Sequence, residues 1–346
     1  MATIRDVAKR AGVSVPTVSR VLNNHPKVAS DLVKRVRSAI KALDYRPSRA
    51  AQRLRTQEST LVGVVLSDIS NPFYIQVLRG IEDVLSREGM NLLVGNADGD
   101  AIHEAELISL MRSEHVAGLV IAPTHEVSPT IKAAIDDRLP VTIIDRRMRD
   151  CDVDTVFADG KAGSHAAVSH LIALGHKRIG VISGPLHLSS AQDRYTGYLQ
   201  AMSEAGLSVD ANLTRFGDYR LESGHDLARE LMNRRKPPTA LFVANNQMTI
   251  GALNAIHEMD IRIPDEVAVV GFDDFDWAIS LNPPLTTIAQ SSYDIGVNAA
   301  SLLLARIGDP DLPKRTVVLN TELKVRASCG AARKNKQVRG LSFEPN

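Results

Sequence analysis

Residues 61–330 alternate short runs of aliphatic and β-branched side chains with stretches of amphipathic helical spacing, and this alternation restricts the fold more than any other feature. Two stretches, "LVGVVLSDISNPF" and "RIGVISGPLHLSS", begin alike, each as a strand followed by a polar turn and a helix. We therefore predict an α/β fold with doubly wound parallel sheets in two related lobes, and a cleft between the lobes. The predicted strands are Leu61–Leu66, Asn91–Gly95, Gly118–Ala122, Val141–Ile144, Arg178–Ile182, Ala240–Val243 and Val267–Val270.

Charge is segregated along the chain. Residues 1–58 hold 13 Lys and Arg against 4 Asp and Glu, a net charge of +9. Residues 59–330 hold 24 against 35, a net charge of −11, and residues 331–346 carry +3. A basic segment joined to an acidic body indicates a polyanion as partner of the first segment alone, because phosphates would repel the body.

Apolar spacing in residues 1–47 predicts a small all-α unit of three helices, with a glycine-containing turn between the first two. Ser14 and Ser30 are suited to cap the second and third helices. Pro16 falls in the first turn of the second helix, where its missing N–H costs nothing. That helix, Val15 to about Asn23, leaves a row of polar side chains facing outward: Thr17, Ser19 and Arg20.

This combination of helix, turn and polar second helix is what a reader of the DNA major groove needs. The turn sets the crossing angle, and the second helix lies in the groove. Arg20 is able to pair with guanine or with phosphate. Together with the charge of +9, the pattern favours DNA binding over a helical bundle with a merely solvated basic face.

Composition excludes several other classes. No window approaches the roughly 18 uninterrupted apolar residues that a membrane span requires. The first ten residues lack the apolar stretch of a secretory signal, and two cysteines, Cys151 and Cys329, are too few for a disulfide framework. We expect a cytoplasmic protein with no membrane partner. Nucleophile-elbow and P-loop motifs do not occur, so no catalytic residue, cofactor or metal site is predicted.

The segments "TIRDVAKRAGVSVPTVSRVLN" and "ALDYRPSRAAQRLR" resemble the headpiece and hinge of the lac/gal repressor family of bacterial transcription regulators. The resemblance implies a first helix from Thr3 to Ala11, a recognition helix from Val15 to Asn23, and a hinge helix from Arg49 to Arg55 that folds only on operator DNA. It also implies that Leu54 of each subunit is wedged into the minor groove, although a buried linker residue is the alternative. The implied contacts to a near-palindromic operator come from Thr3, Ser14, Val15, Pro16, Thr17, Ser19, Arg20, Asn23, Tyr45, Arg49, Ala51 and Leu54.

Further segments, among them "HLIALGHKRIGVISGP", "VVGFDD" and "NPPLTTIAQ", extend the resemblance to about residues 2–330. It implies a body like a periplasmic sugar-binding protein. The tail lacks the leucine heptads with which the lac repressor forms tetramers, so a homodimer is predicted. The expected division is a helix-turn-helix head at 1–47, a hinge helix and linker at 48–58, an effector-binding and dimerisation domain at 59–330 and a flexible tail at 331–346. Within the domain the N-lobe takes about 61–158 and 289–318, and the C-lobe about 159–288 and 319–330.

A sugar-binding cleft needs planar side chains that hydrogen-bond to vicinal hydroxyls, and an aromatic face for the ring. Residues of these types follow predicted strands, and their register in the resembling motifs implies contact with the effector. Structural roles stay open: a cap for Asp273, which has Asp274 beside it, a salt bridge between lobes for Arg194, and core packing for the aromatic residues. The candidates are Phe73, Asp145, Arg194, Tyr219, Asn245, Asp273 and Gln290.

Leu188 stands where purine-sensing members of the family carry an arginine, which favours a neutral polyhydroxylated effector over a nucleobase or nucleoside corepressor. The sequence as a whole predicts a dimeric transcription regulator, a repressor controlled by a small molecule. A solute-binding receptor would share the body, but we would then expect a secretory signal, and the first ten residues do not resemble one. A sugar-modifying enzyme would turn over the bound sugar, and neither alternative explains residues 1–58.

Overall fold

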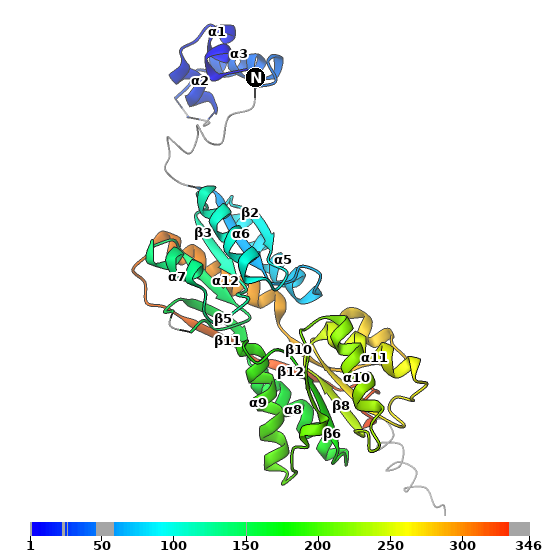
Figure 1. Cartoon of the computed structure of the whole chain (residues 1–346). Coiled ribbons are helices and arrows are strands. Elements are labelled where there is room, and N and C mark those ends of the chain that lie inside the picture. The colour runs from blue at the N-terminus through cyan, green and yellow to red at the C-terminus, as the bar shows by residue number, and fades with distance from the viewer. Residues whose placement is uncertain (1, 23–24, 26, 46–58, 150, 332–346) are drawn as a thin grey trace, which may run out of the picture. The chain divides into compact units, whose positions relative to one another are not determined.

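The computed structural model describes residues 2–22, 25, 27–45, 59–149 and 151–331, which form two compact units divided between Ser59 and Thr60 (Figure 1). We call the first unit the head and the second the body. The predicted hinge helix and most of the tail, from residue 332 on, lie outside the described residues. So do four of the predicted DNA-binding residues, Asn23, Arg49, Ala51 and Leu54.

The described part of the head forms three helices, α1 (Ile4–Ala11), α2 (Val15–Leu22) and α3 (Ser30–Ala42). Thr3 caps α1 in a reciprocal capping box with Asp6, and Gly12 ends the helix in the left-handed conformation at φ +62°. Ser14 accepts a hydrogen bond from the backbone N–H of Thr17, as predicted. The predicted cap by Ser30 is wrong: α3 already begins at Ser30, and its N-cap residue makes no side-chain bond. Small aliphatic side chains fill the core: Val7, Ala8, Ala11, Val18, Val21, Val36 and Ala39.

Within the described residues, the body contains two six-stranded sheets, which confirms the predicted α/β fold. The first sheet, in the N-lobe, is parallel throughout, and the second, in the C-lobe, has one antiparallel pair, β10 with β12. The first sheet runs in the order β11 (Thr316–Leu319), β5 (Asp154–Ala158), β4 (Val141–Ile144), β3 (Gly118–Ile121), β1 (Leu61–Leu66) and β2 (Asn91–Asn96). The second runs β12 (Thr321–Lys324), β10 (Thr286–Gln290), β9 (Ala268–Phe272), β8 (Ala240–Val243), β6 (Ile179–Ser183) and β7 (Thr214–Phe216).

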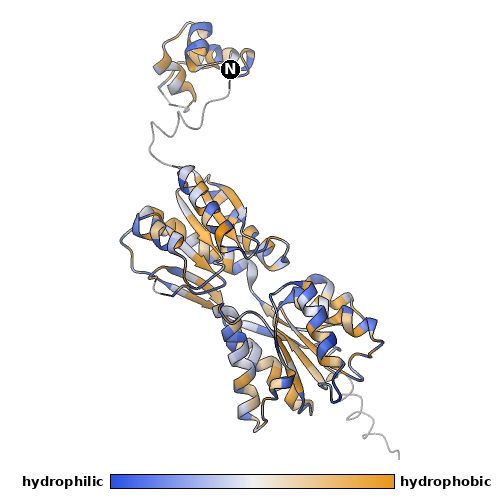
Figure 2. Ribbon diagram, viewed as in Figure 1, coloured by the Kyte–Doolittle hydropathy of each residue, from blue (hydrophilic) through white to orange (hydrophobic). Residues whose placement is uncertain are grey.

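Helices cover both faces of each sheet, because the strands are apolar on both sides and need two layers to bury them. Figure 2 shows the apolar residues gathered along the strands and the polar ones on the outer faces of the helices. No helix among the described residues is both long and apolar enough to cross a bilayer. The N-lobe helices are α5 (Pro72–Arg87) with α12 (Ser292–Gly308) on one face, and α6 (Ala101–Ser113) with α7 (Pro129–Asp136) on the other. In the C-lobe, α8 (Gly160–Ala173) with α9 (Ser189–Glu204) cover one face and α10 (Leu221–Met232) with α11 (Asn246–Glu258) the other; the short helices η1 (Ala211–Leu213) and η2 (Asp276–Ser280) lie in loops.

In the described body, the chain passes from one sheet to the other after β5, after β10 and after β11. Gln290 still pairs with Thr321 in the second sheet, and Leu319 still pairs with Ala158 in the first. Several short connections between two compact lobes provide a natural hinge.

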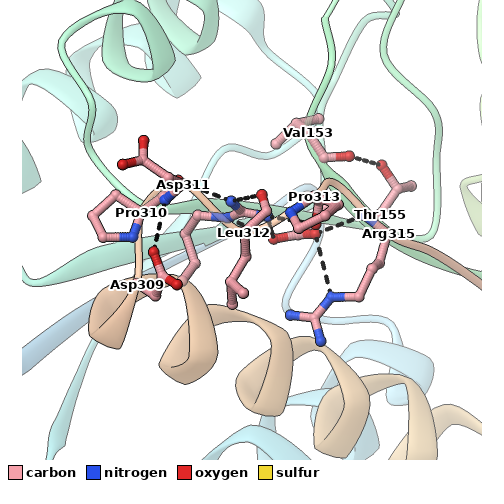
Figure 3. A network of polar contacts seen from close by, with 10 residues as sticks. Val153, Thr155, Asp309, Pro310, Asp311, Leu312, Pro313 and Arg315 are labelled. Atoms are coloured by element: carbon pink, nitrogen blue, oxygen red, sulfur yellow. Dashed lines mark hydrogen bonds and ion pairs between the residues drawn. The ribbon is translucent and has the colours of Figure 1, made fainter.

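A buried ion pair anchors the strand that returns to the N-lobe. Arg306 of α12 donates from Nε and Nη2 to Asp154 Oδ2 at 2.9 and 2.8 Å, and both side chains are almost fully buried. The remaining guanidinium N–H groups bond to carbonyls of the loop before β11, those of Pro310, Leu312 and Pro313 (Figure 3). The pair therefore fixes this loop as well as the helix.

Candidate nucleic-acid interface and ligand-binding cleft

On the head, α2 presents a mixed polar surface. Its Val18 and Val21 are buried in the core, while Val15, Pro16 and Arg20 are exposed. The half-buried Thr17 and Ser19 stand between them. This is the arrangement expected of a helix that enters the major groove, with base-contacting side chains outside and a firm core behind.

Two other predicted DNA-binding residues also have structural contacts in the head. The Thr3 hydroxyl donates to Asp6 Oδ2 at 2.7 Å within the capping box. Tyr45 is half-buried and packs against the head core. Ser14 is exposed, and its hydroxyl lies 2.9 Å from that of Thr17.

In the body, the carboxyl ends of both sheets border a cleft with a volume of about 240 Å³. Parallel strands collect their following loops at this edge, so residues far apart in sequence meet there. The seven residues predicted to contact an effector all line the cleft: Phe73, Asp145, Arg194, Tyr219, Asn245, Asp273 and Gln290.

Arg194 is held in place by neighbouring groups of the C-lobe. It is buried, its Nη1 donates to the carbonyl of Ala244 at 2.7 Å, and its guanidinium carbon lies 4.0 Å from the ring centre of Phe272. The buried Nε has no hydrogen-bond partner among the described residues. Arg194 therefore lines the cleft with a guanidinium that the C-lobe holds in place.

Asp273 follows β9 with a φ of +74°, a left-handed conformation that non-glycine residues rarely adopt. The carboxylate accepts hydrogen bonds from the side-chain amide of Gln290 and the backbone N–H of Asn246. Burial raises the pKa of Asp273, while nearby Arg194 and the bond from Gln290 act against that rise. Gln290 therefore orients the carboxylate as well as lining the cleft.

Asp274, the adjacent carboxylate, does not line the cleft. It accepts two hydrogen bonds from Arg326, at 2.7 and 2.8 Å, and one from Thr287. Although burial opposes ionisation, these bonds hold the pKa of Asp274 below its ordinary value. Of the two adjacent carboxylates, one lines the cleft and the other ties strands of the C-lobe together.

The amide and aromatic candidates are partly structural. Asn245 caps α11 by accepting from the N–H of Met248 at 3.0 Å, and it donates to the Tyr219 carbonyl at 2.9 Å. Tyr219, at φ +71°, lies so close to Gly184 that a Cβ at that glycine would be 2.1 Å from the ring. Phe73 lines the cleft but is only 7% exposed and belongs to the N-lobe core.

On the N-lobe side, a chain of hydroxyl groups holds Asp145. The Ser67 hydroxyl donates to Tyr74 Oη at 2.7 Å, and Tyr74 donates to Asp145 Oδ2 at 2.8 Å. Burial raises the pKa of Tyr74, which keeps its proton available for this bond. The carboxylate is thus oriented by Tyr74 of α5, which is itself held by Ser67, the residue after β1.

Sequence reasoning missed several lining residues. Arg146 directly follows Asp145 at the end of a predicted strand, but strand alternation predicts the opposite face for it. Tyr74 adjoins the predicted Phe73, and Ser190 lies in the turn before Arg194. The lining residues not predicted include Asn71, Tyr74, Asp98, Thr124, Arg146, His187, Ser190 and Arg220.

Direct contacts join the lobes around the cleft. The strongest is a double hydrogen bond from Arg147 to Asp193, at 2.6 and 2.8 Å. Gln192 donates to Glu126 at 2.9 Å. Further contacts run from Asn246 to Asn71, from Gln247 to Ser70 and from Arg220 to Asp98. The body is therefore held with its lobes in contact around the cavity.

A helix-turn-helix head joined to a two-lobed body with a polar cleft defines a DNA-binding protein of the ligand-regulated class. Comparison with known proteins agrees. Residues 3–48 match the family described as bacterial regulatory proteins, lacI family, and residues 168–329 match the periplasmic binding protein-like domain.

Full-length relatives place the chain more narrowly. The ribose operon repressor of Escherichia coli is 33% identical over 330 residues, covering 95% of this chain and 100% of the relative. The HTH-type transcriptional repressor PurR of Photobacterium profundum is 32% identical over 329 residues, covering 95% and 98%. The lac repressor dimer, solved with operator and the anti-inducer ONPF, superposes with a TM-score of 0.82 at 29% identity, covering 95% and 99%. The chain belongs to the lacI family of DNA-binding transcriptional repressors.

Proposed function

We propose that this chain is a homodimeric repressor that binds a near-palindromic operator and changes its operator affinity when a neutral polyhydroxylated molecule of monosaccharide size fills the cleft. The observation that carries the proposal is the cleft itself. It is small and lies between lobes that touch each other, and buried side chains of opposite charge, Arg194 and Asp273, line it together. We propose no enzymatic role.

The size of the cleft supports a small effector. Sites for drug-sized ligands have volumes of roughly 300–1,000 Å³, and this cleft has about 240 Å³. Leu188, which lines it, supplies no charge for a purine. One relative is named for ribose and another is named PurR, so the names of the relatives do not point to one class of effector. The argument for a polyol therefore rests on the chemistry of this cleft.

The contacts between lobes supply a route from effector to operator. A ligand held by both lobes favours the state in which they touch, and it acts only through its different affinity for the two states. The crossings after β5, β10 and β11 allow one lobe to rotate against the other. In a dimer, such a rotation would change the spacing of the two heads and hence the fit to two half-sites.

The head supports operator recognition through α2. The exposed Arg20 is the side chain suited to a bidentate contact with guanine, and the basic charge of residues 1–58 is suited to the phosphates. Leu54, outside the described residues, remains the proposed minor-groove wedge; Leu54→Ala is expected to reduce operator bending and to leave binding to random DNA almost unchanged.

A thermal-shift screen of the full-length protein tests the effector class. A ligand at about 100 times its Kd should stabilise the body by about 2.7 kcal/mol. The panel contains aldopentoses, aldohexoses, their phosphates, nucleosides and nucleobases. A shift from free sugars supports the proposal, whereas a shift from nucleobases alone contradicts it.

A further inference from the structure

We propose that the head carries a second DNA-binding surface, a basic groove between α1 and α3 that holds the backbone of a second duplex while α2 reads the operator. Four cations line this basic groove: Lys9 and Arg10 of α1, and Lys34 and Arg35 of α3. The inference goes beyond the proposed function, because it concerns neither the operator contact of α2 nor the effector. It gives the protein a second partner, a DNA segment of any sequence, and it lets one dimer connect two segments.

The basic groove lies on the side of the head that α2 does not cover. The described residues that line it belong to α1, to α3 and to the turn after α1. All three helices pack on one another, and in such a unit the outer groove between two helices lies opposite the third. An α-helix with its side chains is about 10 Å across. A duplex seated on the outer face of α2 therefore does not reach the basic groove, and a second duplex has room there.

Arg35 and Gly12 give the basic groove a fixed shape. Arg35 extends from α3 to the end of α1, where its Nη2 donates to the carbonyls of Ala11 and Gly12 at 2.7 and 3.1 Å. A Cβ at Gly12 would lie 2.7 Å from that nitrogen, so the glycine leaves room for the guanidinium. The arginine thus satisfies carbonyl groups that a helix end leaves open, and its charge lies at the negative end of the helix dipole.

The other three cations have no such structural role. Lys9, Arg10 and Lys34 are exposed and form no hydrogen bond or salt bridge with any described residue. Four of the nine Lys and Arg residues in the described head line the basic groove, whereas none of its three Asp residues does. Like charges gathered in one groove repel one another unless an anion neutralises them. The charge distribution therefore indicates an anionic partner for this side of the head.

The remaining lining residues favour a nucleic acid over a protein. They are small: Ala11, Gly12, Ser38 and Ala39. The centres of protein interfaces are enriched in aromatic side chains and methionine, and the described lining contains neither. Contacts to phosphates need only Lys, Arg and small hydroxyl groups. The basic groove has a volume of about 530 Å³, more than twice that of the cleft, so an extended polyanion fits it better than a small anion. Such contacts carry no sequence information, so we expect the second duplex to be bound without sequence preference.

The test asks whether full-length protein that is already bound to its operator captures a second duplex. An operator duplex, selected from random sequences with the same protein, is fixed to beads in excess over the protein, so that the α2 faces are occupied. A fluorescent duplex of unrelated sequence is then added at about 50 mM and at about 200 mM salt. We expect the beads to retain it at the lower salt concentration and to lose most of it at the higher one. No retention at the lower salt concentration overturns the inference.

Variants assign the second contact to the basic groove. Lys34→Gln and Arg10→Gln should each weaken retention about 5- to 10-fold at roughly 100 mM salt, because each loses one phosphate contact. The slope of log affinity against log salt should fall in magnitude by about 1. Operator affinity should be unchanged, since both residues lie away from α2. Lys41→Gln is the matched control, because Lys41 is an exposed lysine of the same helix that does not line the basic groove.

Three results contradict the inference and leave operator recognition and effector control intact. The first is a loss of retention in Lys41→Gln as large as that in Lys34→Gln, which would make total charge the cause. The second is a parallel loss of operator affinity in Lys34→Gln, which would place this lysine in the operator contact. The third is displacement of the fluorescent duplex by poly-L-glutamate as effective as that by unlabelled duplex at equal charge, which would indicate an acidic protein as the partner.

Discussion

The adjacent carboxylates of Asp273 and Asp274 allow a matched comparison between effector binding and stability. Asp273→Asn removes a buried charge whose pKa burial has raised, so ionisation of this carboxyl costs the folded state free energy and the melting temperature should not fall. The carboxylate is expected to contribute about 1.5–3 kcal/mol to effector binding through hydrogen bonds to the charged group. Effector affinity should therefore fall by roughly one to two decades.

Asp274→Asn should lower the melting temperature and leave effector affinity unchanged. It breaks the double hydrogen bond with Arg326, in which the two side chains are 22% and 19% exposed, and leaves an arginine charge without its partner. We expect a loss of about 1–3 kcal/mol, which lowers the melting temperature by about 2–8 °C, with effector affinity unchanged. The pKa of Asp274 lies below its ordinary value, so this stability is present above that value and disappears as the pH falls through the lowered pKa.

The assay combines melting curves with calorimetry on the effector found in the thermal-shift screen. Wild-type effector affinity in Asp273→Asn would refute the placement of Asp273 in the binding site. A loss of affinity at constant melting temperature in Asp274→Asn would show that the two roles are exchanged.

Three further perturbations test other parts of the molecule. Arg20→Ala should cost about 1–3 kcal/mol per half-site on the operator and little on random DNA; an equal loss on both would make Arg20 a phosphate contact. Asp154→Ala leaves Arg306 buried without a counter-charge, so chemical denaturation should show a loss of about 3–5 kcal/mol, and a loss below about 1 kcal/mol would contradict the burial argument. His187 stacks on His125 at 4.7 Å, and burial, followed by the charge of His125, holds the pKa of His187 below its usual 6.5. Effector affinity measured by calorimetry should therefore be constant above about pH 7 and fall below pH 6.5, and His187→Gln should remove most of that fall.

Much of the fold was predictable because the strands are strongly apolar. Leu61–Leu66, Val141–Ile144 and Ala240–Val243 form strands with the predicted bounds, since each is a buried aliphatic run with a turn after it. The strands β5, β7, β10, β11 and β12 are absent from the predicted set. Asp154, Arg215 and Glu322 interrupt the apolar pattern of β5, β7 and β12, and none of the four residues of β11 is buried. They form because neighbouring strands offer hydrogen bonds, which is information that a local pattern does not contain.

The cleft was predictable where a strand end placed a polar residue in register with a known motif. Asp145 and Asp273 were identified in this way, and both are found at the cleft with positive φ. Arg146 was missed because strand alternation places it on the far side. A three-residue turn centred on Asp145, closed by a hydrogen bond from the N–H of Arg146 to the carbonyl of Ile144, brings it to the cleft instead. The choice between Asp273 and Asp274 was likewise beyond the sequence, since it depends on Arg326, 52 residues away.

The most direct test of the account is the reciprocal effect of effector and operator on each other. An operator duplex, selected from random sequences with the full-length protein, is titrated by fluorescence anisotropy with and without a saturating monosaccharide from the screen. We expect operator affinity to change by about 5- to 150-fold, and the operator to change monosaccharide affinity by the same factor. A monosaccharide that binds with full dependence on Asp273 and leaves operator affinity unchanged would contradict the claim that the cleft controls the head.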